Sequence, residues 1–206
     1  MSNEEIYYQA DIEDFLKKKP FIIAKGYVSH GKKHFPLAEI KGVIRKVVKN
    51  TVVGNIGQLS IEYSMEIASK SGKTIDIQLL AYGAVKEEIE QQYNDINEAL
   101  HKAYLGPKID HYIRRIEEGG SFKIDDFEFS KAGLRLQKAR LFRKSLQFDV
   151  PWTDIKWNID KLQYLNIGSK SDSKANAQIS METEHEALEL YLFLETYITQ
   201  ANPGIK

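Results

Sequence analysis

The 206-residue chain contains no cysteine, which excludes disulfide bonds, thiolate metal sites and cysteine nucleophiles and fits a reducing compartment. It also lacks an excess of charge, because 29 basic residues balance 29 acidic ones. Proteins that bind nucleic acid are normally basic overall, so no nucleic-acid partner is expected. No apolar run is long enough to span a membrane, and residues 1–5 do not begin a secretory signal. These absences predict a cytoplasmic protein.

Sequence motifs of catalysis are also missing. Residues 54–57 (Gly-Asn-Ile-Gly) lack the Gly-Lys-Ser/Thr end of a phosphate-binding loop. His30 and His34 are four residues apart, but the surrounding pattern is not helical and no nearby carboxylate completes a metal site. No strand-turn-helix motif frames a nucleophilic serine. The sequence therefore predicts a protein that is not an enzyme and that binds no metal and no cofactor.

What the chain does have is the same short pattern twice. Residues 34–41 (HFPLAEIK) correspond to residues 149–156 (DVPWTDIK), and both contain a proline followed four residues later by Ile-Lys. Residues 67–71 (IASKS) correspond in the same way to residues 167–171 (IGSKS). The copies differ in length only within expected hairpins, where insertions cost little. Two copies of one order of elements predict a duplicated small domain.

Hydrophobic periodicity predicts the elements of each copy. Alternation of apolar and polar residues over residues 59–67 indicates a half-buried strand. Apolar steps of three and four over residues 85–104 indicate a helix, and the second copy closes with a helix over residues 184–201. Residues 11–19 are predicted to form a short helix that Pro20 ends. The predicted organisation is an N-terminal helical segment (residues 1–20), a first domain (residues 21–105), a helical connector (residues 106–121) and a second domain (residues 122–202).

In the second copy, residues 127–155 contain a phenylalanine, then Gly-Leu, then Val-Pro-Trp-x-x-Ile, and one amphipathic helix closes the copy. This arrangement resembles the pleckstrin-homology-like (PH-like) domains of bacterial proteins, many of which have no assigned function. The first copy matches less well, because Leu37 replaces the tryptophan and Tyr27 replaces the leucine that follows glycine. The resemblance implies an α+β, mainly β fold in which each domain is a bent antiparallel sheet, a partly open barrel, capped by a C-terminal helix. It also implies a tendency to bind other molecules. The residues that carry the resemblance are Phe127, Gly133, Leu134, Val150, Pro151, Trp152 and Ile155.

The main candidate ligand site is a basic hairpin in the second copy, with Leu141 and Phe142 at its tip. No acidic residue lies between Glu128 and Asp149. In PH-like domains that bind inositol phospholipids, basic residues of the first hairpin hold the phosphates. The other interpretation is a solvated hairpin whose charges prevent edge pairing. The candidate ligand-binding residues are Arg135, Lys138, Arg140, Arg143 and Lys144.

The closing helix carries more apolar residues than one core face needs. Leu190, Phe193 and Tyr197 are predicted to bind a partner, which is the other copy, the connector helix or a second subunit of a homo-oligomer. The alternative is that they cover the N-terminal segment around Phe15.

The sequence thus favours a non-catalytic scaffold that binds a protein or peptide through exposed strand edges and the groove beside the helix. A peripheral protein that binds an anionic membrane surface through the basic hairpin is the alternative, and a small hydrolase or transferase is a third class.

Overall fold

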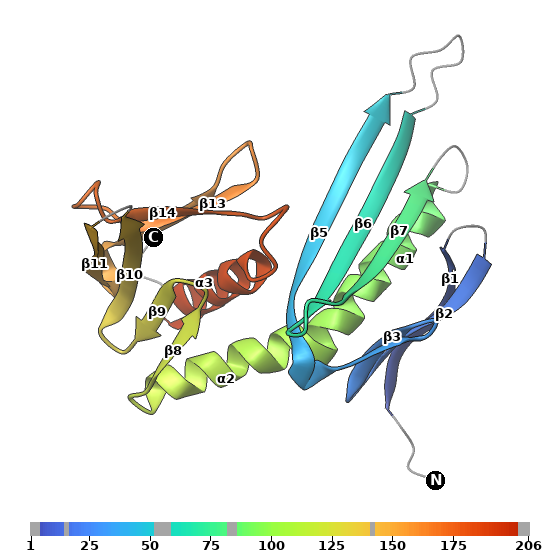
Figure 1. The fold of residues 1–206 in the computed structure, drawn as a ribbon, viewed down its shortest axis with the longest axis horizontal. Helices are drawn as coiled ribbons and strands as arrows, with labels where there is room; N and C mark the ends of the chain where they lie inside the picture. Colours follow the sequence, from blue (N-terminus) through green and yellow to red (C-terminus); the bar gives the residue numbers. More distant parts are fainter. Residues whose placement is uncertain (1–4, 15–16, 52–58, 82–85, 141–142, 202–206) are drawn as a thin grey trace. The chain divides into compact units, whose positions relative to one another are not determined.

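The computed structural model describes residues 5–14, 17–51, 59–81, 86–140 and 143–201 (Figure 1). The described residues form an α+β, mainly β protein with four small antiparallel sheets, none of which closes into a barrel. The chain divides into two compact units, Met1–Pro107 and Lys108–Lys206. In Figure 1 the first unit runs from blue to green and the second from yellow-green to red.

The first unit is built from two meanders and a helix, α1 (Lys86–Leu100). A 3-10 turn, η1 (Leu37–Glu39), joins the two meanders. The strands of the first meander are β1 (Ile6–Asp14), β2 (Lys17–Ala24), β3 (Tyr27–His30) and β4 (Lys33–Pro36). The strands of the second meander are β5 (Ile40–Thr51), β6 (Leu59–Ser69) and β7 (Thr74–Ala81).

The second unit has the same order of elements, as the repeated motifs predict. A 3-10 turn, η4 (Trp152–Asp154), again joins the meanders, and α3 (Ala187–Ala201) is the closing helix. The strands of the first meander are β8 (Ser121–Ile124), β9 (Phe127–Ser130), β10 (Gly133–Arg140) and β11 (Arg143–Pro151). The strands of the second meander are β12 (Ile155–Ile159), β13 (Tyr164–Ser169) and β14 (Asn176–Ser180).

The predicted N-terminal helix over residues 11–19 is wrong, because this segment belongs to the β1–β2 hairpin. Asp11 pairs with Pro20, and Ile12 pairs with Lys19. Ile12 is buried while Asp11 is exposed, which fits the two-residue period of a strand. A segment this short fits both the helical period and the strand period, and the pairing of β1 with β2 decides in favour of a strand.

The helix that closes the first unit does not stop before Gly106 and Pro107, although the sequence predicted a separate connector from residue 106 onward. A π-helical turn, η3 (His101–Leu105), leads directly into α2 (Gly106–Glu117), so the helical stretch is 32 residues long. The N–H of Gly106 donates to the carbonyl of His101, five residues earlier. A proline in a helix removes one donor and crowds the preceding turn. The wider π turn lies next to Pro107 and accommodates it.

The two repeated motifs meet in each unit. Ile40 pairs with Ser69 across β5 and β6, and Ile155 pairs with Ser169 across β12 and β13. The repetition seen in the sequence is therefore one joint, built twice, at the start of the second meander.

Hydrogen bonds from the lysine of each Ser-Lys-Ser motif hold this joint. The main-chain N–H of Lys70 donates to the carbonyl of Glu39 at 2.8 Å, and that of Lys170 donates to the carbonyl of Asp154 at 2.7 Å. Both lysine side chains also donate to a carbonyl of the same 3-10 turn. Because each lysine holds two acceptors of the turn, the motif has a structural role.

Candidate functional site

Arg135, the first residue of the predicted basic site, lies between two carboxylates. It is opposite Glu128 on β9 and opposite Asp149 on β11. Its Nε donates to Asp149 at 2.7 Å, and its guanidinium lies 3.6 Å from the Glu128 carboxylate. The hydrogen bond and charge of Asp149 raise the pKa of Arg135. A phosphate would have to displace both acids, so Arg135 is a structural cation of the sheet.

The other four predicted ligand-binding residues lie on β10 and β11, with side chains outside the described part of the structure. Lys138 and Arg140 belong to β10, and Arg143 and Lys144 belong to β11. The register places Arg140 directly opposite Arg143. Like charges in directly opposed positions of an antiparallel pair repel one another. Leu141 and Phe142, the predicted tip, are outside the described residues.

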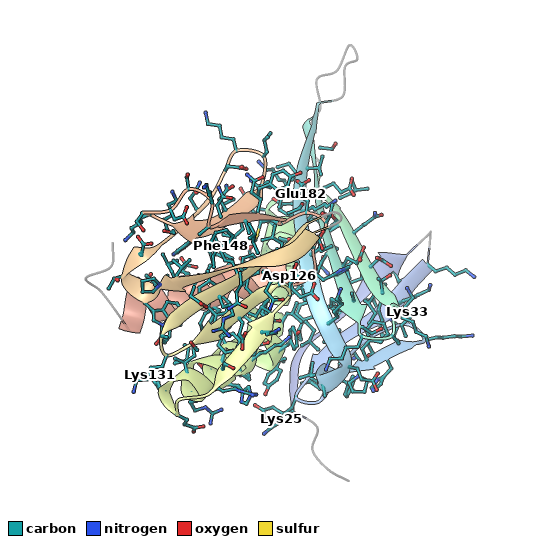
Figure 2. The ribbon with its side chains drawn as sticks, turned by 60° about the vertical axis from the view of Figure 1, so that its left-hand side comes forward. Lys25, Lys33, Asp126, Lys131, Phe148 and Glu182 are labelled. Carbon is teal, nitrogen blue, oxygen red and sulfur yellow. The ribbon has the colours of Figure 1, made fainter. Side chains whose placement is uncertain are left out.

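The basic hairpin is not the first hairpin of the second unit, because β8 and β9 precede it. The turn between β8 and β9 carries two acids, Asp125 and Asp126, and a positive φ of 51° at Asp125. Figure 2 labels Asp126 in this turn and Lys131 in the next one, at the two ends of β9. Partial burial and the charge of Asp126 raise the pKa of Asp125. The first hairpin of the second unit therefore carries acids at its turn, and the basic hairpin is the one between β10 and β11.

The predicted partner-binding residues lie in or against the core of the second unit. Leu190 and Phe193 are completely buried, so they offer no surface to an external partner. Tyr197 is half-buried and stacks on Phe193, with ring centroids 5.6 Å apart, and its ring lies tilted by 48° against Trp152 at 4.6 Å. Phe193 also meets the edge of the Tyr112 ring on α2, the predicted connector helix. Of the predicted alternatives, these contacts match packing against the connector.

A buried charge that sequence reasoning missed joins α2 to α3. The Glu189 side chain is 2% exposed, and its carboxylate accepts hydrogen bonds from Lys108 Nζ at 2.5 Å and from the Tyr112 hydroxyl at 2.6 Å. Burial and the charge of Glu189 raise the pKa of Tyr112 well above its usual range. No sequence signal marked this cluster, because its members are 77 and 81 residues apart.

The serines of the second Ser-Lys-Ser motif form a turn rather than a nucleophilic site. The hydroxyl of Ser169 donates to the Asp154 carboxylate, and the hydroxyl of Ser171 donates to it at 2.8 Å. These bonds, led by that from Ser169, lower the pKa of Asp154. The Ser169 oxygen also accepts the main-chain N–H groups of Ser171 and Asp172. This saturated network closes the β13–β14 turn.

Like the edges of β8, β11 and β14, the edge of β12 is one of the open strand edges of the second unit. This strand is the end strand of its sheet, and no backbone hydrogen bond joins it to any described strand except β13. Its Trp157 ring packs against the Tyr191 ring of α3, with centroids 5.6 Å apart. Ile159, on the same strand face, is 36% exposed. Trp157 and Ile159 share a strand face because they are two residues apart, and the fold brings α3 beside Trp157.

The corresponding edge of the first unit has different chemistry. Its end strand is β5, and the register against the central strand makes Arg45 the equivalent of Ile159. Arg45 donates to the Asn97 side chain of α1 at 3.1 Å. A cation held by an amide therefore occupies the place of an exposed apolar side chain.

Comparison with known proteins finds no match, neither among family models nor among curated proteins or solved structures. Within the described residues, no three histidine, aspartate or glutamate side chains gather as a metal site would require. None of the described helices has the length and apolar character needed to cross a membrane.

Proposed function

We propose that each unit is a PH-like domain and that the chain is a non-catalytic scaffold that binds a protein or peptide partner. The support for the domain class is the order of elements found in both units: a four-stranded meander, a three-stranded meander and a closing helix. The sheets stay open and leave strand edges beside the helices, where PH-like domains bind partners.

The observation that carries this function is the edge of β12 beside α3. An end strand presents unpaired N–H and C=O groups that an extended peptide satisfies by adding as a further strand. Trp157, Ile159 and Tyr191 form an apolar wall next to that edge. Main-chain pairing supplies the affinity, and the apolar wall selects a peptide with an apolar side chain at alternate positions.

Peptides selected from a phage-displayed random library against the whole chain test this function. Ile159→Lys is expected to weaken the selected peptides about tenfold or more, since a charge against the apolar wall costs on the order of 1.4 kcal/mol or more. Fluorescence polarisation measures the affinity, and amide shifts of residues 155–159 locate the site.

The matched control is Val47→Lys, which places the same charge on the exposed part of β5 in the first unit. The selected peptides should bind Val47→Lys and the unchanged chain with equal affinity. Equal binding by Ile159→Lys, or peptide-induced shifts confined to other strands, would refute the β12 site.

A second candidate function, binding to an anionic membrane surface, is favoured by the Arg140–Arg143 pair. Two arginines directly opposite one another are stabilised by an anion between them. Lys138 and Lys144 belong to the same two strands, β10 and β11. Arg135 takes no part in this site, because Glu128 and Asp149 hold it.

Sedimentation with phosphatidylcholine vesicles, with and without phosphatidylserine, tests the membrane function. If the hairpin binds headgroups, the chain pellets only with the anionic vesicles. Replacing Arg140, Arg143 and Lys144 with glutamate then abolishes pelleting, because the site becomes anionic. Arg135→Gln is the control and should pellet normally. Unaltered pelleting of the triple variant would remove this candidate.

A further inference from the structure

The outer face of the second meander in the second unit carries amide side chains on all three strands. They line an open groove of about 560 Å³. The strand register arranges the lining in two rows across β12, β13 and β14. The rows are Lys156, Gly168 and Asn176, then Asn158, Asn166 and Gln178.

The first unit provides a comparison, because the register makes its face equivalent position by position. Glu66 takes the place of Asn166, and Asp76 takes the place of Gln178. The second unit therefore has neutral amides of similar shape where the first has carboxylates. The groove lining contains one cation, Lys156, and no acid.

Local strand preference does not explain these residues. Asparagine and glycine are among the residues least favoured in strands, yet this face combines three asparagines with Gly168. Gly168 has a packing reason, because a Cβ there would lie 2.4 Å from the Ala175 carbonyl oxygen. Asn158 has no such reason, because its side chain makes no hydrogen bond to any described residue. Residues that weaken an element without a packing gain are typical of binding sites.

The amides are oriented before any ligand arrives. Gln178 Nε2 donates to Asn166 Oδ1 at 2.6 Å, and Asn166 Nδ2 donates to the Asp160 carboxylate at 3.3 Å. Lys156 and Asn158, by contrast, make no side-chain hydrogen bond or ion pair to any described residue. One ammonium and one amide are thus available beside a fixed amide pair.

We propose that this groove binds a short acidic oligosaccharide. An amide side chain offers a donor and an acceptor side by side, which matches neighbouring sugar hydroxyls. Lys156 pairs with one carboxylate of the ligand. A phosphate-rich ligand would need several cations or an arginine fork, which this lining lacks.

The length of the face fits a chain of several sugars. Tyr164 is 40% exposed and shares the outer face of β13 with Asn166 and Gly168. Gly168 lies four steps along the strand from Tyr164, which is about 13 Å. The tyrosine ring offers an apolar surface to the C–H face of a sugar at one end, and Lys156 binds the carboxylate at the other. This site shares β12 with the peptide edge but uses the strand face opposite to Trp157 and Ile159, and it does not depend on the peptide function.

Titration of the ¹⁵N-labelled chain with trigalacturonate tests the proposal. Saturable shifts are expected at the side-chain amides of Asn158 and Gln178. Lys156→Gln should weaken binding about two- to fivefold, the effect of one exposed ion pair. Asn166→Glu combined with Gln178→Asp, which installs the residues of the first unit, should abolish binding through charge repulsion.

Three controls define the outcome. Maltotriose has no carboxylate, so the unchanged chain and Lys156→Gln should bind it with the same weak affinity. Glu66→Gln combined with Asp76→Asn in the first unit should leave the trigalacturonate titration unchanged, and the backbone spectrum reports whether each variant is folded. Acetate that shifts the same amides as strongly as trigalacturonate, a folded double variant that still binds, or no saturable shift at all would each overturn the proposal.

Discussion

Replacing Glu189 with alanine is expected to lower the free energy of unfolding of the second unit by about 3–5 kcal/mol, because it breaks an ion pair with a buried carboxylate and removes the acceptor shared by Lys108 and Tyr112. Lys108 lies 2.5 Å from the Glu189 carboxylate and is 27% exposed. The Tyr112 hydroxyl also loses its acceptor. Urea unfolding followed by tryptophan fluorescence measures this unit alone, since both tryptophans of the chain, Trp152 and Trp157, belong to it.

Tyr112→Phe is the matched control for Glu189→Ala. The phenylalanine ring keeps the stack on Phe122, whose ring plane is 3° from that of Tyr112 at 4.1 Å. Only one hydrogen bond is lost, so the expected cost is about 1–3 kcal/mol. Glu189→Leu combined with Lys108→Met removes both charges and should cost less than Glu189→Ala, because an apolar pair often replaces a buried ion pair without loss. An equal or smaller effect of Glu189→Ala than of Tyr112→Phe would contradict the role of the buried charge.

Phe193→Ala is expected to destabilise the second unit by about 3–5 kcal/mol, the usual cost of deleting a buried aromatic ring. Phe193 is completely buried, and its ring lies 4.8 Å from Phe129 and 4.9 Å from Phe122, between centroids. The cavity removes the contacts that hold α3 on β8 and β9. The same urea experiment measures the effect, and near-ultraviolet circular dichroism reports the loss of packing around Trp152.

Two further substitutions show that this effect comes from the core. Phe193→Leu keeps most of the volume and should cost clearly less than Phe193→Ala. Leu162→Ala removes a side chain that is 77% exposed in the β12–β13 turn, and it should change stability by no more than about 0.5 kcal/mol. An unchanged urea midpoint for Phe193→Ala would mean that Phe193 serves a partner rather than the core, as the sequence alone suggested.

The sequence predicted much of the fold because periodicity is a local property. Alternation over residues 59–67 corresponds to β6, and the steps of three and four over residues 85–104 correspond to α1 and its π-helical continuation. The same reasoning failed at residues 11–19. That segment is too short for its period to be decisive, and it contains the end of β1 and the start of β2, which pair with each other.

The candidate sites were less predictable, because a site is made by residues from several strands. The segment without acidic residues between Glu128 and Asp149 suggested a phosphate site at Arg135. In the folded chain, however, the two flanking acids lie opposite this arginine on the neighbouring strands. The apolar closing helix suggested a partner surface at Phe193, but the aromatic residues of the first meander and η4 cover it.

By itself, the sequence determined the duplication, the mainly β character and the closing helices, since these follow from repeated motifs and from the spacing of apolar residues along one chain. Only the tertiary structure decided that the first twenty residues contribute strands, that Arg135 is neutralised and that Glu189 is buried between two helices. Strand pairing and charge burial depend on which distant residues become neighbours, and that information lies in the register and packing of the folded chain.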